Sequence, residues 1–516
     1  MLKLKKVLSM ASVTMLSTCI LSTNLMADSR PDLVVAVTKL TPHFDPMGAN
    51  TNVNERVGEN IVENLIRYDW KTGKIIPGLA TSWKMKNDTT LELQIRDGVM
   101  CHDGSKFTAK DVEIMFGPKR YNGKNAPGYK VGKPFLNTIK SVRAIDGNKI
   151  EITTSKADPL LLNRLSGWMG QVPCSSAYLQ SKNWEQWGQK VIGTGPYKIS
   201  EVKPGELQEF ESFDNYWGKK ATAKTITYKV VPETAARIAG LISGEYDIVT
   251  EIQPDHFKTI TKNKDIEIAG GPIRNIRLIP YDTKHPVLRN PKIRQAMNLA
   301  INRELLVSAL FDGKSTVPNG MQMKSFGEMY IDDFKGTKYN PEKAKELLKE
   351  ASYNGEEISY RYLKDYYTGE VSTAQILQQM WKKVGLNIKL ELKENWGQIE
   401  EDKSAEGRGV INWSSAAYLN DPIGQIYRMF GPEGFFQAHN FWDGTEFNKA
   451  AKDGLFSTDI STRRDAVKEM LTIFEENPPG TYLHVLPMYY GKKKNVNWTA
   501  SDTALMDFRA ESLSFK

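Results

Sequence analysis

Histidine is the residue type in this chain that is best suited to bind a transition metal. The sequence contains six histidines: His43, His102, His256, His285, His439 and His484. Neutral imidazole is a favoured ligand for nickel, copper and zinc, so each of these side chains is a candidate for metal binding. His256 lies in a polar helical stretch and His285 precedes a proline in a loop, so we expect both to be solvated.

Common catalytic motifs are absent from the sequence. It contains no G-x-S-x-G nucleophile elbow, no H-E-x-x-H and no C-x-x-C. Residues 313–316 resemble the end of a phosphate-binding loop, but Ser308 stands where the earlier glycine is required. The segment 193–195 lacks the third glycine of a dinucleotide-binding fingerprint. We therefore predict a binding protein, not an enzyme, and no bound cofactor.

Length and charge restrict the class of protein further. A chain of 516 residues is too long for one hydrophobic core and predicts two or three domains. The 40% hydrophobic and 25% charged residues are typical of a globular protein. The net charge is +8, and loss of the three lysines within residues 1–27 would leave +5. Because the net charge is small and the charged residues of both signs are interspersed, nucleic-acid binding is not expected.

The first 27 residues are typical of a secretory signal. Three lysines form a basic start, and the mostly apolar run 7–21 is too short to span a membrane. We expect cleavage after Ala27. The alternative is a lipoprotein box at 16–19, in which the lipid is attached to Cys19. Both interpretations predict an exported protein.

Two cysteines remain if the first 27 residues are removed, Cys101 and Cys174. An oxidising compartment permits a disulfide between them. The alternative is two separate buried thiols, because the sequence does not show whether the two Cα atoms come within disulfide range.

Short strands dominate the first part of the chain, and longer helices follow. The valine-rich run 33–37 predicts a buried strand, residues 54–68 are helix-like, and 141–153 predict a hairpin around an Asp-Gly-Asn turn. After about residue 270 the pattern predicts a strand at 388–392 and helices at 290–310, 341–351 and 372–384. This alternation is typical of an α/β lobe.

Six stretches carry the strongest signal for function. The central one is Asn290–Leu306, N-P-K-I-R-Q-A-M-N-L-A-I-N-R-E-L-L. The other five are I-P-G-L-A-T-S-W at 76–83, R-D-G with H-D-G and F-T-A-K-D-V within 96–112, G-T-G-P-Y at 193–197, N-Y-W-G at 215–218 and G-E-Y-D-I-V at 244–249. In type and order they resemble the family 5 extracellular solute-binding proteins, the peptide- and nickel-binding receptors of ABC importers.

This resemblance implies an α/β fold of two lobes with a hinge between them, the type II, cluster C-like periplasmic-binding-protein architecture. It divides the chain into a signal peptide at 1–27, lobe I at 28–272 with an inserted subdomain, lobe II at 273–489 and a C-terminal return to lobe I at 490–516. Crossover strands are expected near 273–280 and 484–490. The ligand is expected between the lobes, which would close around it.

The resemblance singles out three histidines as candidate metal ligands. His43 lies in Leu-Thr-Pro-His, which resembles the start of the family, and the loop after it borders the cleft. His484 falls at the second crossover, where a buried imidazole needs a backbone carbonyl or a ligand as partner. His439 lies where a nickel receptor of this family has its ligand-contacting histidine. His102 lies in the His-Asp-Gly turn that both kinds of receptor share, so we expect a structural role.

Peptide receptors of this family anchor the peptide amine with an aspartate in a Trp-x-x-Asp stretch. The matching stretch here is Trp413-Ser414-Ser415-Ala416, so Ala416 stands in place of the carboxylate. An amine-terminated peptide would lose a charge-assisted hydrogen bond, which favours a metal chelate as the ligand.

A chelate requires further groups besides the histidines. Two or three imidazoles do not saturate an octahedral metal, so the resemblance implies a small chelator such as free histidine or a carboxylate compound. Arg428 and Arg120 are candidates for binding its carboxylates through a planar guanidinium. Trp413, Tyr418 and Tyr427 are candidates for the walls of the site.

The sequence thus predicts a monomeric periplasmic receptor that delivers nickel, as a small chelate, to an inner-membrane ABC permease and its ATPase. A di- or oligopeptide receptor of an ABC importer is the alternative. A periplasmic hydrolase is disfavoured by the missing motifs.

Overall fold

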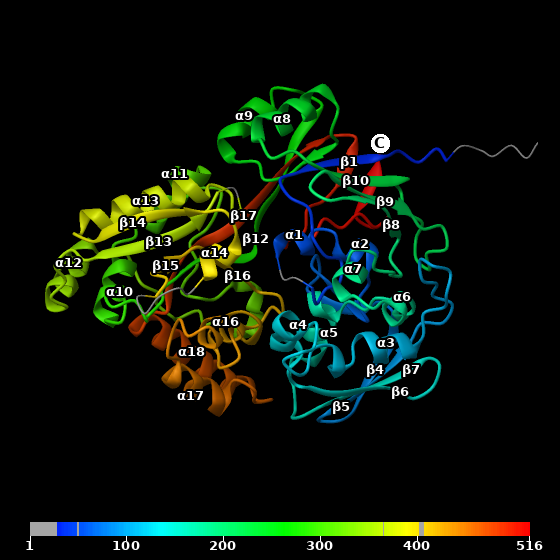
Figure 1. Ribbon diagram of the computed structural model, residues 1–516, viewed down its shortest axis with the longest axis horizontal. Coiled ribbons are helices and arrows are strands. Elements are labelled where there is room, and N and C mark those ends of the chain that lie inside the picture. The colour runs from blue at the N-terminus through cyan, green and yellow to red at the C-terminus, as the bar shows by residue number, and fades with distance from the viewer. Residues whose placement is uncertain (1–27, 49–50, 365, 402–406) are drawn as a thin grey trace, which may run out of the picture.

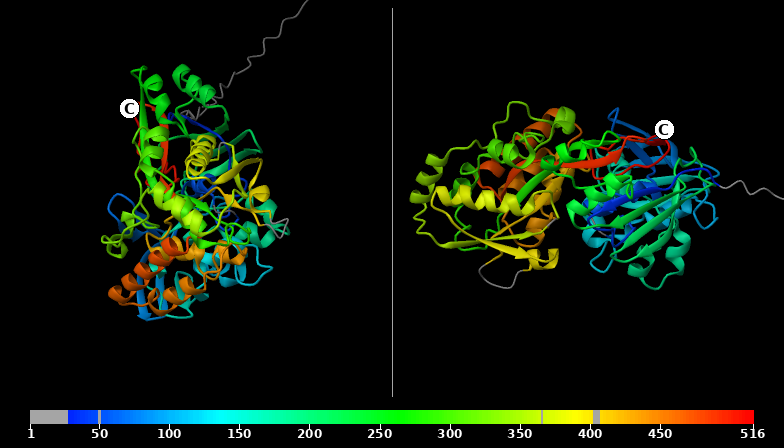
Figure 2. Two further views of the ribbon diagram at one scale, coloured as in Figure 1. Left: turned by 90° about the vertical axis from the view of Figure 1, so that its left-hand side faces the viewer. Right: turned by 90° about the horizontal axis from the view of Figure 1, so that it is seen from above.

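Two long antiparallel strands connect the two halves of the molecule. The computed structural model describes residues 28–516 except 49–50, 365 and 402–406, so the predicted signal peptide and the alternative lipid site at Cys19 lie outside the described residues. Strands β12 (Ile266–Pro280) and β17 (Gly480–Lys493) pair along almost their whole length, with register shifts between Pro272 and Leu278. They pass between the two halves, which lie side by side in the view from above (Figures 1 and 2).

We call the part before β12 and after β17 lobe I, and the part between these strands lobe II. The two expected crossover segments lie within β12 and β17. The division of the chain at residues 272/273 and 489/490 stays a prediction. No helix among the described residues is long and apolar enough to cross a membrane.

The main sheet includes the two connecting strands, β16 of lobe II and the central strands of lobe I, in the order β16-β12-β17-β11-β1-β10-β9-β8. Strand β1 (Leu33–Val37) is buried at its centre and pairs in parallel with its two neighbours, as its valine-rich sequence predicts for a central strand. The other strands are β8 (Tyr197–Lys203), β9 (Leu207–Ser212), β10 (Thr225–Val230), β11 (Ile248–Val249) and β16 (Trp413–Ala416). Helices α8 (Thr234–Ser243) and α9 (Phe257–Ile260) follow, and α8 ends at Gly244 with φ of 89°.

A second sheet of lobe I has the order β4-β5-β7-β6. Its strands are β4 (Ala80–Asn87), β5 (Thr90–Ile95), β6 (Ile139–Ala144) and β7 (Lys149–Thr154), and β6 and β7 form the expected hairpin. The helices of this region are α3 (Ala109–Met115), α4 (Tyr129–Leu136), α5 (Leu161–Ser166), α6 (Ser175–Gln180) and α7 (Trp184–Gly188).

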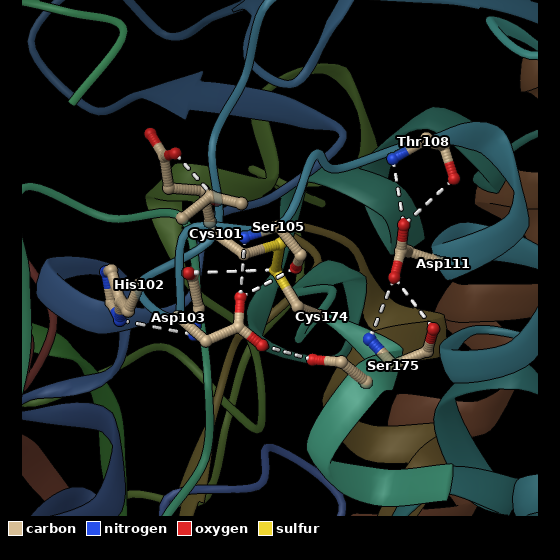
Figure 3. Close-up of a disulfide and its surroundings, with 12 residues drawn as sticks. Cys101, His102, Asp103, Ser105, Thr108, Asp111, Cys174 and Ser175 are labelled. Atoms are coloured by element: carbon tan, nitrogen blue, oxygen red, sulfur yellow. Dashed lines mark hydrogen bonds between the residues drawn. A yellow bond between two sulfur atoms is a disulfide. The ribbon is translucent and has the colours of Figure 1, made fainter. Parts of the chain in front are cut away.

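A disulfide ties two of these segments together. Cys101 and Cys174 are bonded, with Cα atoms 6.3 Å apart, which resolves the alternative left open by the sequence. Beside the disulfide, the Asp111 carboxylate accepts hydrogen bonds from the backbone N–H groups of Thr108 and Ser175, at 2.8 and 2.9 Å (Figure 3). The start of α6 is therefore joined to the turn at Cys101 by a covalent bond and to the start of α3 by polar contacts.

The prediction of a helix at 54–68 is wrong. The segment forms two single-turn helices, α1 (Asn52–Glu55) and α2 (Gly58–Ile61), and then strand β2 (Ile66–Asp69), which pairs with β3 (Lys74–Pro77). At Gly58 a Cβ atom would approach the Gln171 side chain to 2.8 Å. The buried Glu63 also makes tertiary contacts, because its carboxylate accepts hydrogen bonds from Thr194, Tyr216 and Trp217. Long-range contacts here override a local helical pattern.

Lobe II is an α/β unit around a three-stranded parallel sheet, β14-β13-β15. The strands are β13 (Glu357–Leu363), β14 (Asn387–Lys393) and β15 (Val410–Ile411). The helix expected at 290–310 is two helices, α10 (Pro291–Leu299) and α11 (Arg303–Phe311), because Asn302 caps a new helix by accepting a hydrogen bond from Leu305 N. The remaining helices are α12 (Pro341–Glu350), α13 (Glu370–Lys383), α14 (Trp396–Glu400), α15 (Ile426–Phe430), α16 (Phe435–Ala438), α17 (Thr445–Gly454) and α18 (Ile460–Glu476).

The C-terminal segment packs on lobe I. Strands β18 (Val496–Trp498) and β19 (Leu513–Phe515) form an antiparallel pair. Trp498 and Phe508 are buried in the same hydrophobic core as Leu33 of β1.

Candidate ligand-binding site

The loop after β16 carries lobe II side chains against lobe I. The Tyr418 ring lies 5.5 Å from the Phe135 ring and 6.4 Å from the Trp168 ring, measured between ring centroids. The Asn163 side chain donates a hydrogen bond to the Leu419 carbonyl at 3.0 Å. The two lobes are therefore in contact around Tyr418, and two cavities are each lined by residues of both lobes.

The larger cavity has a volume of about 320 Å³ and is lined by both lobes. Lobe II contributes Tyr427, Arg428 and Phe456, and lobe I contributes Lys156 and Arg164. The Arg164 guanidinium is paired with Asp158 at 2.7 Å. A cavity of this size between two lobes can hold a small solute.

The Arg428 guanidinium in this cavity has no anionic partner. Its Nε donates to the Gly424 carbonyl at 3.0 Å, and its Cζ lies 4.9 Å from the Phe135 ring centroid and 5.3 Å from that of Tyr418. No carboxylate of the described chain forms an ion pair with it. Burial lowers the pKa of Arg428 to about 10. Glu433 also lines this cavity, but no ion pair between it and Arg428 is formed in the described structure. A guanidinium that lies against aromatic rings and outside any described ion pair is suited to bind a carboxylate of a ligand.

The smaller cavity has a volume of about 70 Å³, and Tyr418 is one of its lining residues. Three carboxylates line it, Glu55, Glu59 and Asp502. Glu59 is paired with Arg509 at 3.0 Å, and Asp502 with Arg274 at 2.9 Å.

Glu55 differs from the other two acids because no described lysine, arginine or histidine forms a salt bridge with it. Burial raises the pKa of Glu55 to about 7, opposed only in part by the Thr503 hydroxyl, the charge of Arg274 and the Ala504 N–H. A carboxylate in such surroundings gains from a nearby cation.

The structure brings together three of the five predicted ligand-binding residues: Tyr418, Tyr427 and Arg428 all line the cavities between the lobes. Trp413 lines neither of these cavities. It packs among aromatic side chains of lobe II, with its ring centroid 4.7 Å from that of Phe435 and 5.0 Å from that of Trp396.

Arg120 is held within lobe I. Its guanidinium forms an ion pair with the fully buried Asp45 and lies over the rings of Tyr178 and Trp187, at 5.1 and 5.4 Å. Its Nη1 donates to the Met115 carbonyl at 2.9 Å. The charge of Arg120 is therefore already neutralised inside the protein, unlike that of Arg428.

The three predicted metal ligands lie in different surroundings. His43 is buried in lobe I, where its Nδ1 accepts from Asp45 N at 3.2 Å and its ring lies 4.6 Å from that of Trp184. His484 is buried on β17, its Nδ1 lies 2.9 Å from the Val485 carbonyl, and burial lowers its pKa to about 4.

His439 is exposed at the end of α16. Its ring stacks on that of Phe435 at 4.2 Å, and its Nδ1 lies 2.9 Å from the Phe435 carbonyl. The residues that the structure describes contain no group of three or more His, Cys, Asp or Glu side chains that could hold a metal ion. The histidines are therefore not assembled into one metal centre, and a role for each one in binding a metal chelate stays a prediction.

His102 has the structural role that its turn indicates. Its Nδ1 accepts from Gly193 N at 3.3 Å, so its Nε2 donates to the Gly195 carbonyl at 3.0 Å. Burial lowers its pKa to about 4. The imidazole holds the G-T-G-P-Y segment against the turn.

Sequence reasoning missed Glu55. The apolar residues of segment 54–68 recur at helical spacing, so we predicted a helix there. The polar residues that lie between those apolar positions make tertiary contacts, which the prediction did not consider. Asn54 donates to the His43 carbonyl at 2.8 Å, and Arg56 is paired with Glu251. The high proportion of Asn, Glu and Arg in this short stretch was the sequence signal that could have indicated these tertiary contacts.

Two lobes joined by two crossover strands, with cavities between them, define a two-lobed solute-binding protein. The chain matches the family described as Bacterial extracellular solute-binding proteins, family 5 Middle, over residues 74–437. The chain therefore belongs to this family.

Individual relatives agree with this assignment. The Dipeptide-binding protein of Escherichia coli (strain K12) is 24% identical over 468 residues, which cover 84% of this chain and 85% of the relative. The periplasmic binding protein DppA from Helicobacter pylori, solved with the peptide STSA, has a TM-score of 0.83 and 22% identity, covering 94% of this chain and 98% of that one. NikZ from Campylobacter jejuni, solved with Ni(L-His), has a TM-score of 0.77 and 23% identity, covering 90% and 94%. Because one fold holds a peptide in one relative and a nickel chelate in another, the fold alone does not select the solute.

Proposed function

We propose that this protein is the periplasmic receptor of an ABC importer and that it captures a small carboxylate-bearing solute between its lobes. The observation that carries the proposal is the unpaired guanidinium of Arg428 in the larger cavity. A ligand carboxylate would supply the missing charge and accept two parallel hydrogen bonds. The receptor would act as a monomer and deliver the solute to a membrane permease and its ATPase, without a cofactor.

A short peptide is the solute that the geometry favours. Strand β16 is at the edge of its sheet, so alternate backbone groups of its four residues have no strand on their outer side. An extended peptide can pair with such an edge while its terminal carboxylate binds a guanidinium. The described residues contain no group of three or more His, Cys, Asp or Glu side chains that could hold a metal ion, which argues in the same direction.

A nickel chelate with an amino acid is the second candidate. It is supported by Ala416, which leaves β16 without an acid for a peptide amine. It is also supported by His439, whose Nδ1 faces a carbonyl, so that its Nε2 is the nitrogen left for a metal. In this case the chelator carboxylate would bind Arg428, and a single imidazole would complete the coordination of the metal.

Calorimetric titration of the metal-stripped protein separates the two candidates. The titrants are a mixed dipeptide pool, nickel alone and nickel with excess histidine. Binding of dipeptides without a response to nickel supports the peptide proposal. Binding only when nickel and histidine are both present would overturn it in favour of the chelate.

Arg428→Met tests the shared part of the proposal. We expect the affinity for the bound solute to fall by about 10- to 100-fold, since a hydrogen bond to a charged group contributes about 1.5–3 kcal/mol. Arg143→Met is the matched control, because the Arg143 side chain on β6 is 64% exposed and lines neither of the two cavities. An Arg428→Met variant with unchanged affinity would contradict a carboxylate site at this position.

A further inference from the structure

Residues 417–420, which follow β16 in lobe II, lie against lobe I, and we call them the closing segment. We propose that the closing segment holds the two lobes together before a solute binds, so that the solute-free receptor is mostly closed. The inference depends on contacts within the protein and is independent of which solute the receptor carries.

The shape of the closing segment is set outside lobe I. Its first residue, Ala417, donates its N–H to the Arg274 carbonyl on β12 at 2.8 Å, and the Asn420 N–H closes a turn by donating to the Ala417 carbonyl at 3.0 Å. Asn420 has φ of 52°, a left-handed conformation that asparagine adopts more readily than most residues. Leu419 packs so closely on Gly424 of lobe II that a Cβ atom there would approach the Leu419 Cβ to 2.5 Å. A segment with a fixed shape loses little entropy when it docks.

The aromatic ring of the segment packs on lobe I. The Tyr418 ring centroid lies 5.5 Å from that of Phe135 and 6.4 Å from that of Trp168. The backbone also approaches closely, since a Cβ atom at Gly167 would come within 3.2 Å of the Tyr418 carbonyl oxygen. Aromatic pairs at these distances stabilise a contact beyond the area that they bury.

Polar contacts fix the segment on both sides of its aromatic ring. The Asn163 side chain of lobe I donates to the Leu419 carbonyl at 3.0 Å. The Asn420 side chain accepts from the Arg274 guanidinium, whose Nε is paired at 2.9 Å with Asp502 of the C-terminal segment. Every donor and acceptor in these contacts belongs to the protein, so they can form before a solute binds.

The lobes also meet outside the closing segment, in contacts that join the two halves directly. The Lys156 ammonium group of lobe I lies 3.7 Å from the ring centroid of Phe456 in lobe II. The Asn137 side chain of lobe I donates to the Glu433 carboxylate of lobe II at 3.0 Å. Each of these contacts is weak at an exposed position, but all of them favour the same relative position of the lobes as the closing segment does.

A closed solute-free form has a consequence for binding. A solute enters between the lobes only while they are apart, so the apparent affinity is reduced by the fraction of receptor that is open. The strength of the closing segment therefore sets how often the receptor is ready to accept a solute.

Distances between spin labels on the two lobes measure the open and closed populations by pulsed electron paramagnetic resonance. The labels are attached at Arg143→Cys on β6 of lobe I and at Lys449→Cys on α17 of lobe II, two exposed positions. A Cys19→Ser background keeps the labelling specific, because Cys101 and Cys174 are bonded to each other. The protein is unfolded in urea and refolded to remove any bound solute, and it is measured with no solute added.

For the wild type we expect the short distance of the closed form to dominate. Tyr418→Ala should raise the ratio of open to closed protein by about 2- to 10-fold, the effect of losing an aromatic contact. Asn163→Ala, which changes lobe I instead, should shift the ratio in the same direction by a similar factor. Tyr418→Phe keeps the ring and should keep the closed form. Tyr339→Ala is the matched control, because Tyr339 is an exposed tyrosine of lobe II, and it should change nothing.

Thermal unfolding confirms that each variant is folded. A wild type that is open, and that adopts the short distance only after a dipeptide pool is added, overturns the inference and leaves the proposed function standing. Tyr418→Ala and Asn163→Ala distributions that match the wild type also overturn it, because the closing segment would then not hold the lobes. The proposed function fails separately, if Arg428→Met binds solute as the wild type does, whatever the distances show.

Discussion

Arg120, which is buried, and Arg428, which is half-buried, have the same predicted role, and they differ in what surrounds their charge. Arg120 lies within lobe I, where Asp45 neutralises it and two aromatic rings enclose it. Arg428 lines a cavity between the lobes, also against two aromatic rings, and no described acid forms an ion pair with it, although Glu433 lines the same cavity. The comparison shows that an arginine stabilises the fold when the protein supplies its anion and can bind a ligand when the protein does not.

The comparison predicts first that Arg120→Met destabilises the protein strongly. The substitution leaves the Asp45 carboxylate, which is fully buried, without its counter-charge. Breaking a buried ion pair in this way costs about 3–5 kcal/mol. Urea unfolding of the unliganded protein measures the loss, with Arg143→Met as an exposed control that should change stability by less than about 0.5 kcal/mol. A loss below about 1 kcal/mol for Arg120→Met would refute a structural role.

The second prediction concerns the disulfide that fixes α6, the helix whose Tyr178 packs over Arg120. Replacing both Cys101 and Cys174 by serine opens a cross-link between positions 73 residues apart. We expect a loss of about 2–4 kcal/mol in the free energy of unfolding. Solute affinity at low temperature should change little, because the Arg428 cavity lies on other elements. A large loss of affinity in a folded variant would mean that the two regions are coupled.

Arg428→Met should have the opposite effect on stability from Arg120→Met. It removes a half-buried cation that no described acid pairs with, so we expect the unliganded protein to be unchanged within about 1 kcal/mol, or more stable. Parallel urea unfolding of the two variants measures the contrast. Equal destabilisation by both would remove the distinction on which the ligand site depends.

The smallest expected effect is a pH dependence that comes from Glu55. Its pKa is raised from 4.5 to about 7 in the folded protein, so the folded state holds a proton that the unfolded state releases. The stability that this proton provides is present below pH 4.5 and is lost as the pH rises to about 7.

In Glu55→Gln this loss should be absent, and the variant should be more stable than the wild type above pH 7 by on the order of 1 kcal/mol. Unfolding midpoints between pH 4.5 and 8 measure the effect. Glu59→Gln serves as control, since Glu59 is paired with Arg509. Parallel pH curves for the wild type and Glu55→Gln would show that the Glu55 carboxyl is not desolvated.

Elements with local signals were predictable from the sequence. The β6–β7 hairpin forms around its Asp-Gly-Asn turn, and α12 begins at Pro341 after the Asn340 cap, as its pattern indicates. These structures depend on turn and cap chemistry within a few residues. The order of the family motifs also identified the two-lobed fold correctly.

Segments whose partners are distant in the chain were predicted less well. Residues 54–68 have helical spacing, yet contacts of Glu63 with residues more than a hundred positions away divide the segment into two turns and a strand. The break between α10 and α11 also went unrecognised, because the apolar positions continue through it. Tertiary contacts outweigh a weak local preference in both cases.

The sequence by itself determined the class of the protein, a two-lobed solute-binding protein of family 5, together with its local turns, caps and strands, because these depend on neighbouring residues and on motif order. Only the tertiary structure decided that Cys101 bonds to Cys174, that the described residues hold no group of three or more candidate metal ligands, and that Arg428 and Glu55 line cavities without an ion pair to any described residue. The physical reason is that a side chain's charge is defined by its type, whereas its compensation depends on groups that the fold brings from distant positions.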